Sequence, residues 1–211
     1  MFSNHMFNYN NSLPKIRGKV RFFHASPSAP NVDIYADDYL IAKNISFKNS
    51  SKYIEIPADD YDFKIFIAGE TNKPILKKEI DITPNGVFTI SAINLPGNLD
   101  LRIITDASTY SDNSNISFLR FIHYSPTAPL LDLSLLNNKK LFKFVEYKEG
   151  TGYFPLSPES YNFKISSSEN DKLNLMIPNI RLEQNKFYTL YSLGLPGEKP
   201  EFQTHLLEDG F

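Results

Sequence analysis

The sequence predicts an all-β chain made of two tandem β-sandwich domains of the immunoglobulin or fibronectin type. Three observations lead to this prediction: one segment recurs about 100 residues later, apolar residues alternate with polar ones, and turn-forming residues recur at short intervals. We expect about seven to eight strands per domain, because sandwiches show this spacing of strands and turns. A small closed barrel is the alternative architecture.

The internal repeat consists of three blocks that occur twice in the same order. Residues 21–33, RFFHASPSAPNVD, match residues 120–132, RFIHYSPTAPLLD, at eight of thirteen positions. The later pairs of blocks are YDFKI at 61–65 with YNFKI at 161–165, and NGVFTISAINLPG at 85–97 with NKFYTLYSLGLPG at 185–197. A repeat of this kind predicts two copies of one structural unit.

The offset between the copies grows from 99 to 100 residues after the first block. The inserted residue falls between ADDYL at 36–40 and LNNKKL at 136–141, where a polar pair predicts a hairpin turn. The predicted organisation is a flexible N-terminal tail at 1–18, a first sandwich at 19–107, a polar linker at 108–115 and a second sandwich at 116–211.

Alternation with a period of two predicts the strands. Tyr61, Phe63 and Ile65 alternate with Asp62 and Lys64, which places the apolar side chains on one face of a sheet. In the first copy we expect strands near 20–25, 32–35, 40–45, 51–56, 61–67, 75–80, 87–93 and 99–104.

The composition excludes several classes of function. The net charge is -2 with a pI of about 6.1, so there is no basic excess for nucleic-acid binding. The chain has no cysteine, which excludes disulfides, thiolate nucleophiles and cysteine-ligated metals. No apolar run is long enough for a transmembrane helix. The N-terminus lacks the pattern of a signal peptide, which makes a cytoplasmic location one alternative.

Both copies of the first block, RFFHASPSAPNVDIY at 21–35 and RFIHYSPTAPLLDLS at 120–134, resemble the repeats of the bacterial family called domain of unknown function 4397. The strand starts PADDY at 57–61 and SPESY at 157–161 are similar to another segment of that family. The resemblance implies a β-sandwich module that is usually exported and surface-associated and has no established enzymatic activity.

The repeated block predicts a stiff corner between two strands, because two X-Pro steps restrict the backbone. A polar aspartate in the following strand needs hydrogen-bond partners, which the histidine, the serine or nearby backbone amides could supply. These structural corner residues are His24, Ser26, Pro27, Pro30 and Asp33 in the first copy, and His123, Ser125, Pro126, Pro129 and Asp132 in the second.

A catalytic His–Ser–Asp set is the sharper alternative for these residues. The sequence offers neither a nucleophile elbow nor a glycine-rich oxyanion loop, so we predict that the residues are structural and that the chain has no catalytic residues. A calcium site at Asp33, Asp37 and Asp38 is a further alternative, but the second copy has Asn137 and Asn138 there. We therefore expect no metal and no cofactor.

Two other features could take part in binding. The Leu-Pro-Gly turns at 95–97 and 195–197 are duplicated, and loops at one end of a sandwich are common binding sites. Tyrosines could stack on sugars, although cross-strand packing is the simpler interpretation. The tyrosines concerned are Tyr35, Tyr53, Tyr110, Tyr147 and Tyr153.

The sequence thus favours a non-catalytic binding or scaffolding module of the cell surface or envelope, and a spore location is compatible with it. An envelope protein or a cell-wall glycan is the expected partner, and two copies would raise avidity. A carbohydrate-binding protein is the first alternative. A hydrolase that uses the His–Ser–Asp segment is the second.

Overall fold

The computed structural model describes residues 16–107, 115–169 and 172–210, and every regular element in these ranges is a β-strand. None of the described segments forms a helix that is long and apolar enough to cross a membrane. We call the described residues up to 107 repeat 1 and those from 115 onwards repeat 2.

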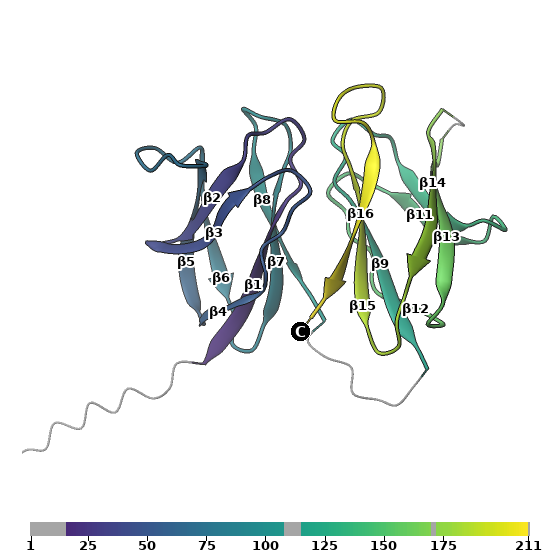
Figure 1. The fold of residues 1–211 in the computed structure, drawn as a ribbon, viewed down its shortest axis with the longest axis horizontal. Helices are drawn as coiled ribbons and strands as arrows, with labels where there is room; N and C mark the ends of the chain where they lie inside the picture. The colour runs from purple at the N-terminus through teal and green to yellow at the C-terminus, as the bar shows by residue number, and fades with distance from the viewer. Residues whose placement is uncertain (1–15, 108–114, 170–171, 211) are drawn as a thin grey trace, which may run out of the picture.

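Each repeat contains eight strands (Figure 1). Repeat 1 consists of β1 (Arg17–His24), β2 (Val32–Ala36), β3 (Tyr39–Ile45), β4 (Ile54–Pro57), β5 (Asp59–Ile67), β6 (Leu76–Ile82), β7 (Val87–Ile93) and β8 (Asp100–Thr105). Repeat 2 consists of β9 (Ser117–His123), β10 (Leu131–Leu135), β11 (Lys140–Val145), β12 (Phe154–Leu156), β13 (Ser160–Ser167), β14 (Asn174–Arg181), β15 (Phe187–Leu193) and β16 (Gln203–Asp209).

The strands of each repeat form two four-stranded sheets with the same order in both repeats. The inner sheets, which face each other across the molecule, have the orders β4-β1-β7-β8 and β12-β9-β15-β16. The outer sheets have the orders β3-β2-β5-β6 and β11-β10-β13-β14. The pairs β1–β7 and β9–β15 are parallel, and the other pairs are antiparallel. The predicted tandem sandwich is therefore confirmed, and the closed barrel was the wrong alternative.

The strands fall close to their predicted positions. β1 begins at Arg17, inside the range predicted as an N-terminal tail. The rest of that tail, residues 1–15, lies outside the described residues, as does most of the predicted linker, 108–114.

Each repeat has its own apolar core between its two sheets. Phe22 and Phe63 belong to the core of repeat 1, and the equivalent Phe121 and Phe163 belong to the core of repeat 2. A third cluster lies between the inner sheets and contains Phe23, whose side chain points opposite to that of Phe22 because a strand alternates its faces. Its other members are Ala25, Ile93, Ile122, Tyr124, Tyr191 and Leu193, with Phe47, Ile104 and Leu207 at its margin.

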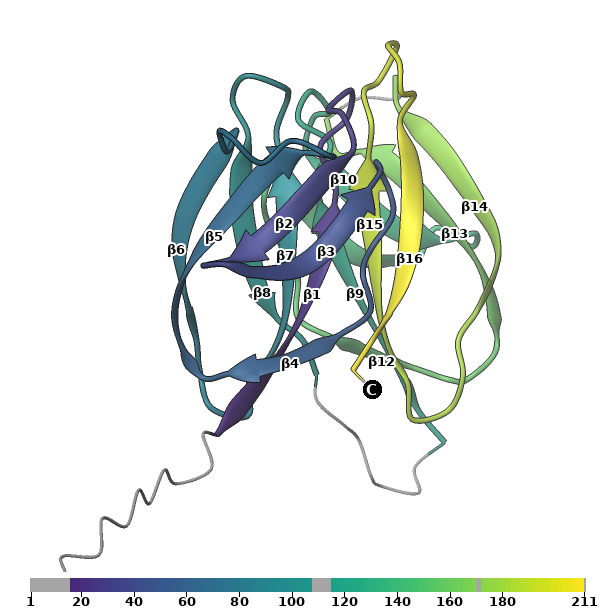
Figure 2. The ribbon, with the colours of Figure 1, turned by 60° about the vertical axis from the view of Figure 1, so that its left-hand side comes forward.

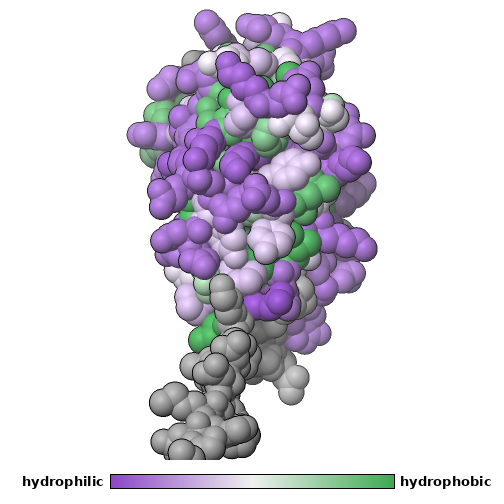
Figure 3. All heavy atoms as spheres, turned by 90° about the vertical axis from the view of Figure 1, so that its left-hand side faces the viewer, coloured by the Kyte–Doolittle hydropathy of each residue, from purple (hydrophilic) through white to green (hydrophobic). Residues whose placement is uncertain are grey.

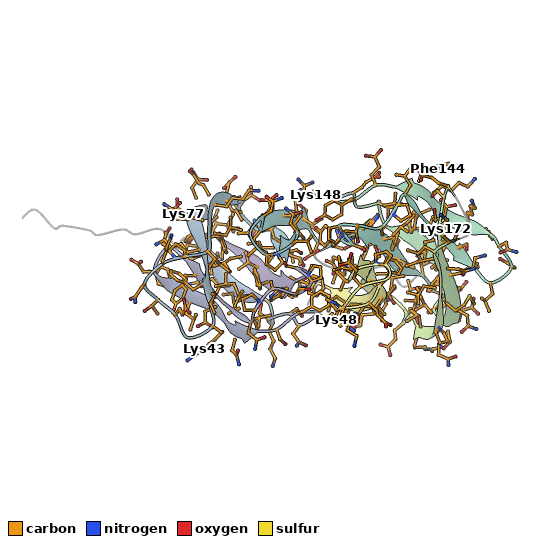
Figure 4. The ribbon with its side chains drawn as sticks, turned by 90° about the horizontal axis from the view of Figure 1, so that it is seen from above. Lys43, Lys48, Lys77, Phe144, Lys148 and Lys172 are labelled. Atoms are coloured by element: carbon orange, nitrogen blue, oxygen red, sulfur yellow. The ribbon has the colours of Figure 1, made fainter. Side chains whose placement is uncertain are left out.

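The two repeats lie side by side with their first strands running in the same direction (Figures 1 and 2). Viewed from above, the equivalent residues Lys48 and Lys148 lie near the boundary between the repeats, at opposite edges of the molecule (Figure 4). An approximate twofold axis that runs along the strands therefore relates repeat 1 to repeat 2. The face of repeat 1 that is turned away from repeat 2 is largely hydrophilic, with small apolar areas between the polar side chains (Figure 3).

Candidate functional site

The two corner histidines are buried and make the same contact. His24 and His123 are both 0% exposed, and each has its Nε2 3.0 Å from a proline carbonyl oxygen, that of Pro30 or Pro129. This contact fixes the neutral ring with a proton on Nε2, because a carbonyl can only accept a hydrogen bond. Each histidine thus ties the end of its strand to the start of the next one.

Burial lowers the pKa of both histidines. The pKa of His123 falls to about 4 from its usual 6.5, mainly because the charged form would lose its hydration. The pKa of His24 is lowered for the same reason. Both rings are therefore neutral near pH 7, because the loss of hydration outweighs the contacts with backbone carbonyls, which favour the charged form.

The two corner serines are equally buried and bind the neighbouring strand. Ser26 donates its hydroxyl proton to the carbonyl of Asn94, and Ser125 donates to the carbonyl of Gly194 at 2.6 Å. These bonds fasten the corner to the turn that contains the Leu-Pro-Gly motif. The proton of each serine hydroxyl is thus held by a backbone carbonyl and not by the neighbouring histidine.

The corner aspartates bind groups on other strands and loops, so the partners differ from those expected within the corner. Asp33 accepts hydrogen bonds from the amides of Asn44 at 2.6 Å and Gly69 at 2.9 Å. Asp132 accepts from the amide of Phe144 at 2.9 Å and from the hydroxyl of Ser168 at 2.6 Å.

These aspartate bonds stabilise an irregularity at the edge of each outer sheet. Asn44 has a φ of 52° and Phe144 a φ of 55°, and the pairing register shifts beside both residues. A shift with a left-handed residue is typical of a β-bulge, and its amide needs a partner outside the ladder. The carboxylates of Asp33 and Asp132 supply that partner.

The residues considered for calcium are used in other ways. Asp37 accepts a hydrogen bond from the amide of Asp62 and has a φ of 50°, which fits the predicted hairpin turn. Asp38 is exposed, 3.8 Å from the ammonium group of Lys64. Within the described residues, no group of three or more histidine, aspartate or glutamate side chains is arranged to hold a metal ion.

A buried polar cluster at the boundary between the repeats was not predicted. Arg21 of β1 reaches across to Asp209 of β16, with 2.7 Å between Nη2 and Oδ1, and donates to the carbonyl of Glu208 at 2.7 Å. Arg120 of β9 reaches the other way to Asp106 and donates to the carbonyl of Thr105 at 2.8 Å. We call these two arginines and two aspartates, together with the threonines and tyrosines that bind them, the Arg–Asp cluster.

Threonines and tyrosines complete the Arg–Asp cluster. Thr89 donates to Asp106 at 2.6 Å and accepts from Arg21, and Tyr53 also donates to Asp106, at 2.7 Å. In repeat 2, the equivalent Thr189 and Tyr153 make the same bonds to Asp209 and Arg120. The cluster is therefore complete only when both repeats are in contact.

Each arginine also lies over a tyrosine ring. The guanidinium carbon of Arg21 is 4.5 Å from the ring centre of Tyr53, and that of Arg120 is 4.7 Å from that of Tyr153. This cation–π geometry adds attraction at a site that water does not reach. The rings of Tyr53 and Tyr153 are thus used inside the protein, which agrees with the packing interpretation that the sequence favoured over sugar stacking.

The charged side chains of the Arg–Asp cluster are almost completely buried. The side chains of Arg21 and Arg120 are 5% and 4% exposed, and those of both aspartates 0%. Burial, followed by the charge of Asp209, raises the pKa of Asp106 above its ordinary 3.8. Burial alone would lower the pKa of Arg120, but its acidic and tyrosine neighbours raise it. Removing one partner would leave a buried charge without compensation.

The other tyrosines suggested for sugar binding differ in their contacts. Tyr147 donates its hydroxyl proton to the side chain of Asn94 across the boundary. Tyr35 packs edge to face on Phe66 within repeat 1, with ring centres 5.5 Å apart. Tyr110 lies outside the described residues.

Two equivalent hollows at one end of the molecule are the candidate ligand sites. In repeat 1, a cavity of about 610 Å³ lies between the β5–β6 loop, with Lys73, and the β7–β8 turn, with Gly97. In repeat 2, a cavity of about 450 Å³ lies between the β13–β14 loop, with Lys172, and the β15–β16 loop, with Gly197. We call these the repeat 1 and repeat 2 loop sites.

The loop sites contain both Leu-Pro-Gly turns, which the sequence had singled out. Gly97 and Gly197 have φ values of 85° and 77°, and space is open around both. Glycine is therefore needed there for the turn conformation, and the turns leave their sites accessible. The loops that line both sites lie at the upper end of the molecule in Figure 1, opposite the start of β1 and the end of β16.

Comparisons with known proteins identify the family and little more. No curated protein matches the chain. Among solved structures, the Bacillus anthracis TIE protein is similar at 12% identity and a TM-score of 0.25; the match covers 89% of this chain and 34% of that one. This chain thus spans about a third of that protein's length. The model of the family described as Domain of unknown function (DUF4397) matches residues 18–134 and 117–210. These two matches take in both repeats, so the chain belongs to the DUF4397 family, as the resemblance in its sequence predicted.

Proposed function

We propose that the chain is a non-catalytic binding or scaffolding module of the cell envelope or surface. One observation carries the proposal: the reciprocal Arg–Asp cluster joins the repeats so that the loops of both sites lie at the same end of the molecule. Two sites in fixed relative orientation suit a partner that offers repeated epitopes, because the second contact then forms at high effective concentration. An envelope protein or a cell-wall glycan is a partner of this kind.

The corner residues support a role without catalysis. His24 and Ser26, with their copies, are 0% exposed and bind backbone carbonyls. A general base and a nucleophile have to reach a substrate, and these side chains hold a strand corner instead. The duplicated motif is thus explained by the fold.

Carbohydrate binding remains the second candidate. It loses support from Tyr53, Tyr147 and Tyr153, which are used at the boundary between the repeats. Exposed aromatic residues elsewhere support it, since Tyr39 is 71% exposed and Phe144, in the outer part of repeat 2, is 59% exposed (Figure 4). Aromatic faces of this kind are able to stack on sugars.

A sedimentation assay with two preparations tests the proposal. Peptidoglycan stripped of protein and envelope that retains its proteins are each mixed with the purified chain and pelleted. We expect the chain to pellet with at least one preparation, and the choice between them separates a glycan partner from a protein partner. A chain that stays in the supernatant with both would refute an envelope-binding role.

Charge reversal then locates the binding surface. Lys73→Glu and Lys172→Glu alter one loop site each, and Lys43→Glu, at an exposed position of β3, makes the same charge change elsewhere. We expect each loop-site variant to bind about 10- to 100-fold more weakly, the double variant to lose binding, and Lys43→Glu to bind normally. Equal effects of all three substitutions would show that net charge, and not the loop sites, governs binding.

A further inference from the structure

The charged part of the boundary between the repeats is self-complementary. Each repeat contributes one arginine and one carboxylate, and the approximate twofold axis places the arginine of each opposite the carboxylate of the other. Surfaces related in this way need no second, different surface, because the same set of groups serves on both sides. A repeat therefore carries on its inner sheet half of a contact that another repeat completes.

The apolar part of the boundary is not symmetric. Repeat 1 has the small residues Ala25 and Ser91 where repeat 2 has Tyr124 and Tyr191 at the equivalent positions. The ring of Tyr191 packs on Phe23 of repeat 1, with 4.6 Å between ring centres. Small residues on one side thus make room for large ones on the other.

This asymmetry decides which repeats can pair. Two copies of repeat 1 would leave space at Ala25 and Ser91, and two copies of repeat 2 would bring Tyr124 and Tyr191 against themselves. Cavities and overpacking both destabilise a contact, so the favoured pair is one repeat 1 with one repeat 2. Nothing in these contacts requires the two repeats to belong to the same chain.

We propose that the inner sheet of each repeat is a docking surface for the opposite repeat of a second copy of this chain. Two chains then exchange repeats and form a closed dimer that contains two complete Arg–Asp clusters. In a single chain, the connection between the repeats supplies a millimolar effective concentration, so the intramolecular contact prevails at ordinary protein concentrations. When the connection no longer allows the two repeats of one chain to meet, the same surface becomes a dimer contact.

Shortening the connection tests this without changing the contact. Deleting residues 108–114 makes Ala107 and Asn115 consecutive, with Cα atoms about 3.8 Å apart. The end of β8 and the start of β9 lie well apart in both ribbon views (Figures 1 and 2). We expect the shortened chain to have about twice the mass of a single chain by light scattering, where the full-length single chain has 24.1 kDa. Lengthening the segment with seven glycine and serine residues is the control and should leave a monomer.

The surface responsible is identified by adding Asp209→Arg to the shortened chain. This substitution places two arginines opposite each other at Arg21, so the dimer should dissociate. A shortened chain that stays monomeric, or a dimer that survives Asp209→Arg, would overturn the proposal.

A mixing experiment tests exchange in chains of natural length. Arg21→Asp and Asp209→Arg each place like charges at the boundary, so neither variant alone should form a stable contact. In an exchanged pair, one contact is native, and the other joins the aspartate introduced at position 21 to the arginine introduced at position 209. After refolding together, we expect a species that contains both chains and melts above either variant alone. A mixture that melts as the sum of its components would contradict exchange.

Discussion

Replacing Asp209 with asparagine is the sharpest test of the Arg–Asp cluster. The carboxylate is 0% exposed and accepts hydrogen bonds from Arg21 at 2.7 Å, from Tyr153 at 2.8 Å and from Thr189. Asparagine keeps the shape of the side chain but removes the negative charge, and its amide group turns one acceptor into a donor. Arg21 then stays buried with Asp106 as its remaining carboxylate neighbour, at 3.8 Å.

The expected loss of stability follows from this burial. Breaking a buried ion pair by removing one partner typically costs about 3–5 kcal/mol, because the remaining charge has lost its compensation. Glu208→Gln is the matched control, since Glu208 is the preceding residue and forms an ion pair with Lys186 on the surface. Exposed pairs of this kind contribute at most about 1 kcal/mol.

Urea denaturation measures the difference between the two variants. The chain has 12 tyrosines and no tryptophan, so tyrosine fluorescence and circular dichroism are suitable probes. The free energy of unfolding is extrapolated to zero urea for the wild type and both variants. If Asp209→Asn costs no more than Glu208→Gln, the cluster does not hold the repeats together in solution, and the reasoning above fails.

Three further perturbations test other parts of the structure. The free energy of unfolding should fall by about 3 kcal/mol between pH 6.5 and about 4, because the unfolded chain protonates His123 near the higher pH and the folded chain only near the lower. The same dependence of stability on pH in His123→Gln would contradict this. Asp132→Ala should lower the free energy of unfolding by about 1–3 kcal/mol, because the amide of Phe144 and the hydroxyl of Ser168 lose their acceptor, whereas Asp38→Ala at an exposed site should be neutral. Phe144→Asn should stabilise the chain by about 1 kcal/mol, because the exposed Phe144 adopts a φ of 55° and the equivalent residue in repeat 1 is Asn44; a lower melting temperature would argue against strain there.

The sandwich could be predicted from the sequence because its signals are local. Alternation along β5 places Tyr61, Phe63 and Ile65 on one face, and the duplication shows the same pattern twice. Turn residues mark the ends of the strands, as the φ of 50° at Asp37 and of 85° at Gly97 show. Local periodicity and turn chemistry were therefore enough to locate most strands.

The partners of the corner residues could not be predicted in the same way. The sequence indicated that Asp33 needs hydrogen bonds, and the nearest donors in the chain suggested His24 and Ser26. The actual donors are the amides of Asn44, in the irregular part of β3, and of Gly69, in the loop after β5, which the pairing of three strands brings close. A need for partners is visible in a sequence, but the identity of the partners depends on tertiary structure.

The sequence contains only weak signals of the contact between the repeats. β7 is buried along its whole length, including the polar Thr89 and Ser91, which alternation alone would place in solvent. Arginine in the first block of both copies, at Arg21 and Arg120, was a usable signal. Its distant carboxylate partners lie at or just after the end of the last strand of each repeat and carry no motif of their own.

The apolar and polar parts of this contact have different roles: the first stabilises the contact and the second fixes its register. The apolar cluster around Phe23 and Tyr191 supplies most of the favourable burial, but such contacts tolerate sliding, because apolar attraction has no direction. The Arg–Asp cluster does not tolerate it: a shift of one residue along β1 moves Arg21 by about 3.3 Å and breaks its 2.7 Å contact with Asp209. The same shift would separate Arg120 from Asp106 on the other side of the axis. We infer that the buried charges fix the register of two facing sheets, and that this register keeps both loop sites at the same end of the molecule.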